Sequence, residues 1–231
     1  DPEFISSVEI AKGTSAGQGG AGVLGGIATF NTVDAREFLT DGKEMGGRLR
    51  AGHGIGELGN GTNFNGSAVF AFGNETGDVL LGLSERHFGD YRAGTSDKDN
   101  LGTQIRLRNI HPQAWEHWLE SEVGDTGSVS RSRLFKLGLN LPEDQRLQFS
   151  YMEYDADSKN AWTYVSSDAQ TTYYLRSSAS DLIARNAALD YSYNPDSNLI
   201  DLEAKLYYVT TREDRWNAAS SMMRREAYGD L

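Results

Sequence analysis

The 231-residue chain contains no cysteine. Disulfide scaffolds, thiolate zinc sites and thiol nucleophiles are therefore excluded. Proline is also scarce, with 4 residues, whereas glycine reaches 26 and the aromatic residues comprise 4 Trp, 11 Tyr and 9 Phe. High glycine with little proline and many aromatic side chains indicates a β-protein with tight turns rather than a disordered linker.

The chain has fewer basic than acidic residues: 22 Lys and Arg against 33 Asp and Glu, which gives a formal net charge of −11. This balance argues against a nucleic-acid-binding protein that holds phosphates by charge, and against attachment to an anionic inner leaflet through a polybasic patch. The chain also lacks any apolar run near the ~18 residues that a membrane-spanning helix requires. A membrane β-barrel remains open, because its alternating strands average out as polar.

Alternation of apolar and polar residues is the main signal that the chain does carry. Phe135, Leu137, Leu139 and Leu141 share one face of a segment whose other face carries Lys136. A period of two predicts a β-strand with one apolar face. The same period recurs at residues 46–55, 67–72, 79–86, 147–152, 182–193 and 200–208. The sequence therefore predicts about seven strands.

The predicted connections alternate between short and long. Short turns are expected at residues 74–77, 142–145 and 194–198, and long connections near 89–127 and 156–180. This asymmetry is typical of outer-membrane barrels, which have short periplasmic turns and long extracellular loops. It favours an all-β fold that spans a membrane.

A soluble antiparallel sandwich is the alternative, because its strands alternate as well. Charged residues lie in the middle of the polar faces, for example Asp190 and Lys205, and tyrosines such as Tyr191 and Tyr193 lie beside a short turn. Aromatic girdles at the membrane interfaces predict that placement. The barrel is favoured over the sandwich on this ground.

A glycine-rich stretch near the start resembles a phosphate-binding loop only superficially. Gly17, Gly19 and Gly22 fit the pattern G-x-G-x-x-G. That pattern binds a dinucleotide only where a helix follows it, and here a predicted strand follows. Nucleotide binding is therefore not expected.

The same stretch resembles the end of the plug domain of TonB-dependent outer-membrane receptors. That family has a segment V-E-V-x-[KR]-G-…-G-…-G-G-x-[IV] just before its barrel. The matching residues are Val8-Glu9-Ile10, Lys12-Gly13, Gly22, Gly25-Gly26 and Ile27, with Thr14 in place of the commoner proline. The run from Phe30 to Leu39 is similar to F-x-T-x-D-A-x-[DE]-[LF]-L of the haem-receptor branch. The resemblance covers residues 7–39.

The resemblance implies a transmembrane antiparallel β-barrel preceded by the C-terminal part of a plug domain. Residues 5–41 would be the plug part and residues 42–231 the N-terminal part of the barrel. Residues 1–4 are interpreted as vector-derived and left out of the fold. A plugged barrel of this kind has 22 strands, which need about 220 residues without loops, so the chain is expected to supply only about seven of them.

The function implied by the resemblance is energised uptake of a scarce nutrient across the bacterial outer membrane, most specifically haem. The cargo would be captured outside and released by plug rearrangement. Expected partners are outer-membrane lipid, haem or a haem-carrying protein, and the TonB complex, which would bind parts that precede this chain. Haem would be the transported ligand, and no prosthetic group, nucleic-acid partner or enzymatic activity is expected. The alternatives are a small complete outer-membrane barrel with a structural or adhesive role, and a secreted β-sandwich binding module.

Histidine is the natural axial ligand for haem. Of the four histidines, His53 and His87 fall in predicted strands, while His111 and His117 lie in the long connection 89–127. His111 is the residue we favour as a haem ligand, with an ordinary loop residue as the alternative.

Glu9 and Lys12 occupy charged positions of the plug motif. The resemblance implies that they hold the plug against the barrel wall by charged hydrogen bonds. No catalytic residue and no metal site is predicted, because no nucleophile–base pair or ligand spacing can be recognised.

Overall fold

A computed structural model describes residues 1–13, 25–40, 42–55, 63–92, 122–123, 126–165, 173–195 and 199–219. In order along the chain, these contain η1 (Pro2–Phe4), β1 (Ile5–Lys12), β2 (Gly26–Thr32), η2 (Ala35–Glu37), β3 (Met45–Gly54), β4 (Asn63–Gly73), β5 (Gly77–Phe88), β6 (Tyr91–Arg92), β7 (Glu122–Val123), β8 (Ser128–Leu141), β9 (Gln145–Val165), β10 (Tyr173–Tyr193) and β11 (Leu202–Ala219). None of the helices in this described part is long and apolar enough to cross a membrane.

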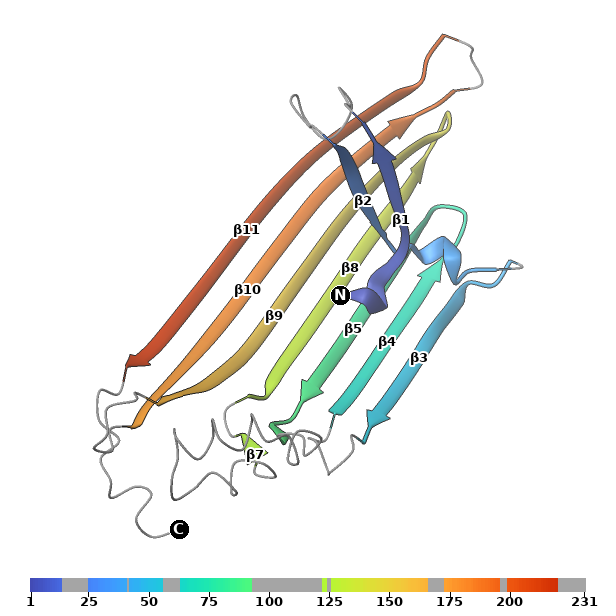
Figure 1. The fold of residues 1–231 in the computed structure, drawn as a ribbon. Coiled ribbons are helices and arrows are strands. Elements are labelled where there is room, and N and C mark those ends of the chain that lie inside the picture. Colours follow the sequence, from blue (N-terminus) through green and yellow to red (C-terminus); the bar gives the residue numbers. More distant parts are fainter. Residues whose placement is uncertain are drawn as a thin grey trace.

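Seven of the strands form one antiparallel sheet, in the order β11-β10-β9-β8-β5-β4-β3. Neighbours in the sheet follow one another along the chain, except that the small pair β6–β7 lies between β5 and β8 in sequence. The sheet is curved and its strands are strongly tilted, and the β1–β2 hairpin lies across one face (Figure 1). The strands predicted from the period of two are thus confirmed.

Strands β9, β10 and β11 are longer than the sequence predicts. They contain 21, 21 and 18 residues, whereas a tilted strand crosses a bilayer in about 9–11 residues. The loop predicted at residues 156–180 is correspondingly short, because β9 continues to Val165 and β10 begins at Tyr173. The physical reason is that these strands pair with each other over their whole length, even where their apolar alternation has ended.

The two faces of the seven-stranded sheet differ in chemistry. We call the face that carries the hairpin the inner face, and the opposite face the outer face. Near the short turns, neighbouring rows of outer-face residues are almost entirely apolar, and together they form an apolar band. Many side chains of this band are exposed, including Phe70, Phe72, Leu81, Leu139, Leu141, Phe149, Leu189 and Leu206. An exposed apolar band opposite a polar face is the pattern of a membrane barrel wall and not of a soluble sandwich.

An apolar cluster fixes the chain segment before β3 to the inner face. Phe4 and Val33 from that segment are 0% and 1% exposed, and they pack with Val69, Leu80 and Leu134 of the sheet. Gly82 makes room for the ring, because a Cβ at this position would lie 2.9 Å from Phe4.

This packing corrects the expectation that residues 1–4 lie outside the fold. The sequence Asp1-Pro2-Glu3-Phe4 resembles vector residues, yet it forms η1 and buries Phe4 completely. The backbone carbonyl of Phe4 also accepts a 2.8 Å hydrogen bond from the Val33 amide. Residues 1–4 therefore belong to the docked segment.

Replacing Phe4 by alanine should loosen this docking. Removal of a buried phenylalanine side chain costs about 3–5 kcal/mol, so hydrogen exchange at the Val33 amide should become faster in a protein that carries this segment. The matched control is Phe30→Ala, because Phe30 lies on β2 and is 61% exposed. Equal acceleration in both variants would contradict the role of the cluster.

Candidate functional site

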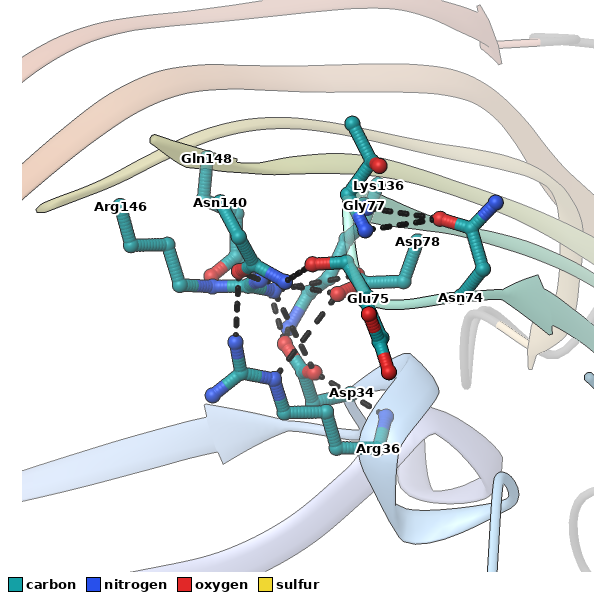
Figure 2. A network of polar contacts seen from close by, with 11 residues as sticks. Asp34, Arg36, Asn74, Glu75, Gly77, Asp78, Lys136, Asn140, Arg146 and Gln148 are labelled. Carbon is teal, nitrogen blue, oxygen red and sulfur yellow. Dashed lines mark hydrogen bonds and ion pairs between the residues drawn. The ribbon is translucent and has the colours of Figure 1, made fainter. Parts of the chain in front are cut away.

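Polar residues from far apart in the sequence meet where η2 rests on the inner face near the short turns (Figure 2). We call this group the junction. It comprises Asp34, Arg36, Asp78, Lys136, Asn140, Arg146 and Gln148. The first two residues belong to the linker between the hairpin and β3, and the others belong to β5, β8 and β9.

The linker turn is built by its own side chains. Asp34 is the N-cap of η2 and accepts a hydrogen bond from the Arg36 backbone amide, while the Glu37 carboxylate accepts one from the Asp34 amide. This reciprocal capping box satisfies backbone donors that a short helix leaves unpaired. The turn therefore presents Asp34 and Arg36 to the sheet in a fixed geometry.

An ion pair within the wall forms the floor of the junction. Arg146 of β9 donates two hydrogen bonds to the Asp78 carboxylate of β5, at 2.8 and 3.0 Å, and the Asp78 side chain is only 5% exposed. The pair crosses over Gly138 of β8, where a Cβ would lie 2.7 Å from Cζ of Arg146. A larger residue at Gly138 would displace this bidentate pair.

Arg36 attaches the linker to this floor. Arg36 donates a 2.9 Å hydrogen bond to the Asn140 side-chain oxygen, and its Nε lies 3.8 Å from Asp78. Asn140 in turn accepts from Arg146 and donates to the Glu75 carbonyl in the β4–β5 turn. One network therefore joins the linker, the three strands β5, β8 and β9, and a turn.

Asp34 is the main contact on the linker side. It accepts a 2.7 Å hydrogen bond from the Gln148 side chain, and it lies 3.8 Å from Lys136 and 3.9 Å from Arg146. Lys136 is 8% exposed and also donates to the Thr32 carbonyl at the end of β2. A buried ammonium needs such partners, because unpaired it would bear the full desolvation penalty.

The surroundings of Asp34 shift its titration. Burial raises the pKa of this carboxyl, but the hydrogen bonds from Gln148 and the Arg36 amide, with the charges of Lys136 and Arg146, outweigh burial. The net pKa lies below the ordinary value of 3.8. Asp34 therefore stays ionised, and its ion pairs persist, at neutral pH.

A second polar contact holds η1. The Asp1 carboxylate accepts hydrogen bonds from Ser84 and Ser132, at 3.1 and 3.0 Å, and Glu3 accepts from Ser67 and Arg50, at 3.0 and 3.1 Å. The chain segment before β3 is thus attached to the wall at η1 and at η2, which flank the β1–β2 hairpin.

The residues predicted to bind plug to barrel lie elsewhere. Glu9 accepts a 2.9 Å hydrogen bond from Asn31 of the same hairpin, and Lys12 lies at the far end of β1, paired through its backbone with Gly26. Among the described residues, neither side chain forms a hydrogen bond or ion pair with the seven-stranded sheet. Their contact with the barrel wall stays a prediction.

The histidines are divided between the outer face and the residues that are not described. His53 and His87 are exposed and flank Phe64 in one row of the outer face. They point away from the interior. His111, the favoured haem ligand, lies outside the described residues, as does His117. In the described part of the chain, no three His, Asp or Glu residues gather as a metal site would require.

The sequence contained weak signals for the junction. Asp34 belongs to the motif of the family resemblance, and Lys136 is a mid-strand charge. Asp78 and Arg146 each stand in the polar phase just after a short turn, but only the strand register shows that they meet across β8. The junction offers no nucleophile–base pair, so what it can do is attach the linker to the wall.

Comparison with known proteins identifies relatives over most of the chain, although no protein-family model matches. The heme transporter BhuA of Brucella ovis is 30% identical over 198 residues, which cover 84% of this chain and 27% of that protein. The hemin receptor of Yersinia enterocolitica is 28% identical over 211 residues, which cover 90% of this chain and 26% of that protein. The chain therefore spans about a quarter of the length of the curated relatives it matches.

Solved structures agree. The hemophore receptor HasR of Serratia marcescens, a double mutant in complex with its hemophore HasA and heme, is 42% identical with a TM-score of 0.67, over 93% of this chain and 27% of that chain. The FrpB iron transporter from Neisseria meningitidis is 17% identical with a TM-score of 0.54, over 96% of this chain and 36% of that chain, and supports the fold alone. The predicted barrel-wall fold is confirmed, and the relatives are transporters and receptors rather than enzymes.

Breaking the Asp78–Arg146 pair should destabilise the barrel wall. Removing one partner of a buried ion pair costs about 3–5 kcal/mol, because the other charge is left uncompensated. We expect Asp78→Asn and Arg146→Gln each to lower the free energy of unfolding by this order in denaturant titrations of a protein that carries this segment. The double variant should lose much less than the sum of the two.

The matched control for that cycle is the exposed inner-face pair Asp190–Lys205, whose atoms are 2.9 Å apart and whose side chains are 38% and 62% exposed. Asp190→Asn should cost less than about 1 kcal/mol. Additive losses at Asp78 and Arg146 would show that the two side chains do not act as a pair.

Acid should release the linker through Asp34. Since the pKa of Asp34 is lower in the folded state, its stabilising contribution is complete above the unfolded value of about 4 and is lost as the pH falls through the lower folded value. A spin label on Thr40→Cys, which would be the only cysteine of this chain, should become mobile below about pH 4. Asp34→Asn should give a more mobile label at neutral pH. A label that is equally immobile in both proteins would refute this role of Asp34.

Proposed function

This chain belongs to the TonB-dependent receptors, and from that premise we propose that it is the plug-to-barrel portion of an outer-membrane receptor that takes up haem. The observation that carries the proposal is the 42% identity to a hemophore receptor over 93% of this chain. The relatives named as heme transporter and hemin receptor point to the same cargo. In this proposal residues 5–41, together with the docked residues 1–4, end the plug, and residues 42–231 begin the barrel.

The orientation follows from the lengths of the connections. The short turns near the junction would face the periplasm, and the long ends of β9, β10 and β11 would extend beyond the outer surface of the membrane. The exposed apolar band on the outer face supports contact with lipid, whereas a soluble sandwich module would have to cover that band. A small barrel made of this chain alone is disfavoured, because both edge strands β3 and β11 lack a second partner within the described sheet.

Transport would proceed by capture outside, followed by a plug rearrangement that is driven from the periplasm through the TonB complex. Haem, alone or delivered by a carrier protein, would be released because its affinity differs between the resting and energised states. The junction and the η1 contact would hold the two ends of the described plug segment, and the hairpin between them is free to move without breaking a buried ion pair. His111 would contribute to capture as a haem ligand from an extracellular loop.

Haem uptake can be tested with the full-length receptor that carries this segment. In a bacterial host that lacks its own haem receptor, the receptor should restore growth with haem as the sole iron source, and only when TonB is present. The purified receptor should bind haem in a spectroscopic titration. Growth with a ferric siderophore but not with haem would contradict the proposed cargo.

The same titration can test the candidate ligand. His111→Ala should weaken haem binding or change the haem absorption spectrum, and His117→Ala, in the same connection, serves as the matched control. If both variants bind haem like the parent protein, His111 is not a ligand, while the proposed cargo would still stand.

A further inference from the structure

Charged residues of the outer face are arranged in rows that change sign with distance from the apolar band. The row next to the band contains Arg133, Glu153 and Arg185, which are neighbours on β8, β9 and β10. The next row contains Glu85, Arg131, Asp155 and Arg212, and the row beyond contains Asp157, Asp181 and Asp214. Among the described residues, the first row therefore carries one excess positive charge, the second is balanced and the third carries three negative charges, while Lys159 lies one row farther out.

Glu153 holds the two guanidinium groups of the first row in place. It accepts hydrogen bonds from Arg133, from Nε of Arg185 at 2.8 Å and from the Tyr151 hydroxyl at 2.9 Å. Arg131, one row further out, pairs through Nε with Glu85 at 3.1 Å. Each guanidinium has five N–H donors, and within the described residues these contacts occupy only a part of them. The side chains of Arg131, Arg133 and Arg185 are each 48% exposed on the outer face.

An apolar groove leads along the outer face to these arginines. Its floor is formed by Gly66 and Ala68 of β4 and its rims by Phe64 and Leu83, while Glu85, Arg131 and Arg133 are the charged residues that line it. The hollow exists because Gly66 and Ala68 are smaller than the residues paired with them on β5. The Phe64 ring covers part of Gly66, and a Cβ at Gly66 would lie 3.0 Å from this ring. The groove thus combines an apolar channel with two guanidinium groups, one of which pairs with the Glu85 carboxylate.

We propose that this outer-face site binds one phosphate-bearing lipid of the surrounding membrane. The phosphate would accept charge-assisted hydrogen bonds from Arg131 and Arg133, and one acyl chain would lie in the groove over Gly66 and Ala68. Planar guanidinium groups match phosphate oxygens in bidentate geometry. The carboxylates of the third row, Asp157, Asp181 and Asp214, repel the phosphate and so keep it at the level of the arginines.

The shape of the site favours a lipid over free phosphate. A free anion would use the guanidinium groups alone, while a lipid also removes the apolar groove from contact with water or disordered chains. The site also lies at the boundary between the apolar band and the charged strand extensions, which is the depth at which headgroups meet acyl chains. This inference depends on the barrel-wall fold and not on the haem cargo, so either can fail alone.

The test uses the full-length receptor, stripped of lipid in detergent and examined by native mass spectrometry. The probes are phosphatidic acid, diacylglycerol of the same chain length, and inorganic phosphate. We expect one phosphatidic acid to bind at least about tenfold more tightly than diacylglycerol. Arg131→Gln/Arg133→Gln should abolish that preference, and Ala68→Leu, which fills the groove, should weaken binding of the lipid without an effect on inorganic phosphate.

The matched control is Arg212→Gln on β11, an outer-face arginine that pairs with Asp214 away from the groove. It should bind phosphatidic acid like the parent protein. Three outcomes would overturn the proposal: equal binding of phosphatidic acid and diacylglycerol, retention of the preference in the double arginine variant, or inorganic phosphate binding as tightly as the lipid. Haem uptake by the same variants should be unchanged, which separates this site from the proposed transport function.

Discussion

Burial of charge on the inner face of the sheet is the constraint on which the rest of the arrangement depends. Asp78 and Lys136 lie almost out of contact with solvent, where an unpaired charge would be very costly. Asp78 forms an ion pair with Arg146 of the same wall, whereas Lys136 forms its ion pair with Asp34 of the linker. Docking of η2 therefore compensates the buried charge of Lys136. The apolar packing around Phe4 further stabilises the docked segment on the wall.

This division gives the described plug segment two different kinds of contact with the wall. Its ends, at η1 and η2, are held by buried side chains, whereas the hairpin between them carries exposed residues such as Ile10 and Phe30, at 71% and 61% exposure. A segment with few buried contacts opens at a lower free energy than its surroundings. The hairpin is thus the part of this segment that can move while the junction stays closed.

The sequence was sufficient for the strands but not for the contacts between them. A period of two places Phe135 and Leu137 on the outer face, and the structure confirms it. In the segment 182–193, Arg185 interrupts the run of apolar residues on the outer face. Only the strand register explains this arginine, because it places Arg185 beside Glu153 beyond the apolar band. The pairing of Arg146 with Asp78 could not be predicted either, because 68 residues separate them and the intervening connection carries no signal for the register. The burial of Phe4 could not be predicted, because the composition of residues 1–4 says nothing of the pocket that receives its ring.

Mechanical unfolding of the full-length receptor from its N-terminal side would test the central claim, that the plug segment is attached at η1 and η2 and not along the hairpin. We expect two separate force peaks, one for release of Phe4 and one for release of the Asp34 junction. About 100 Å of chain should extend between them at low force, corresponding to residues 5–32 at full extension. A single peak that releases the whole segment at once would contradict the account.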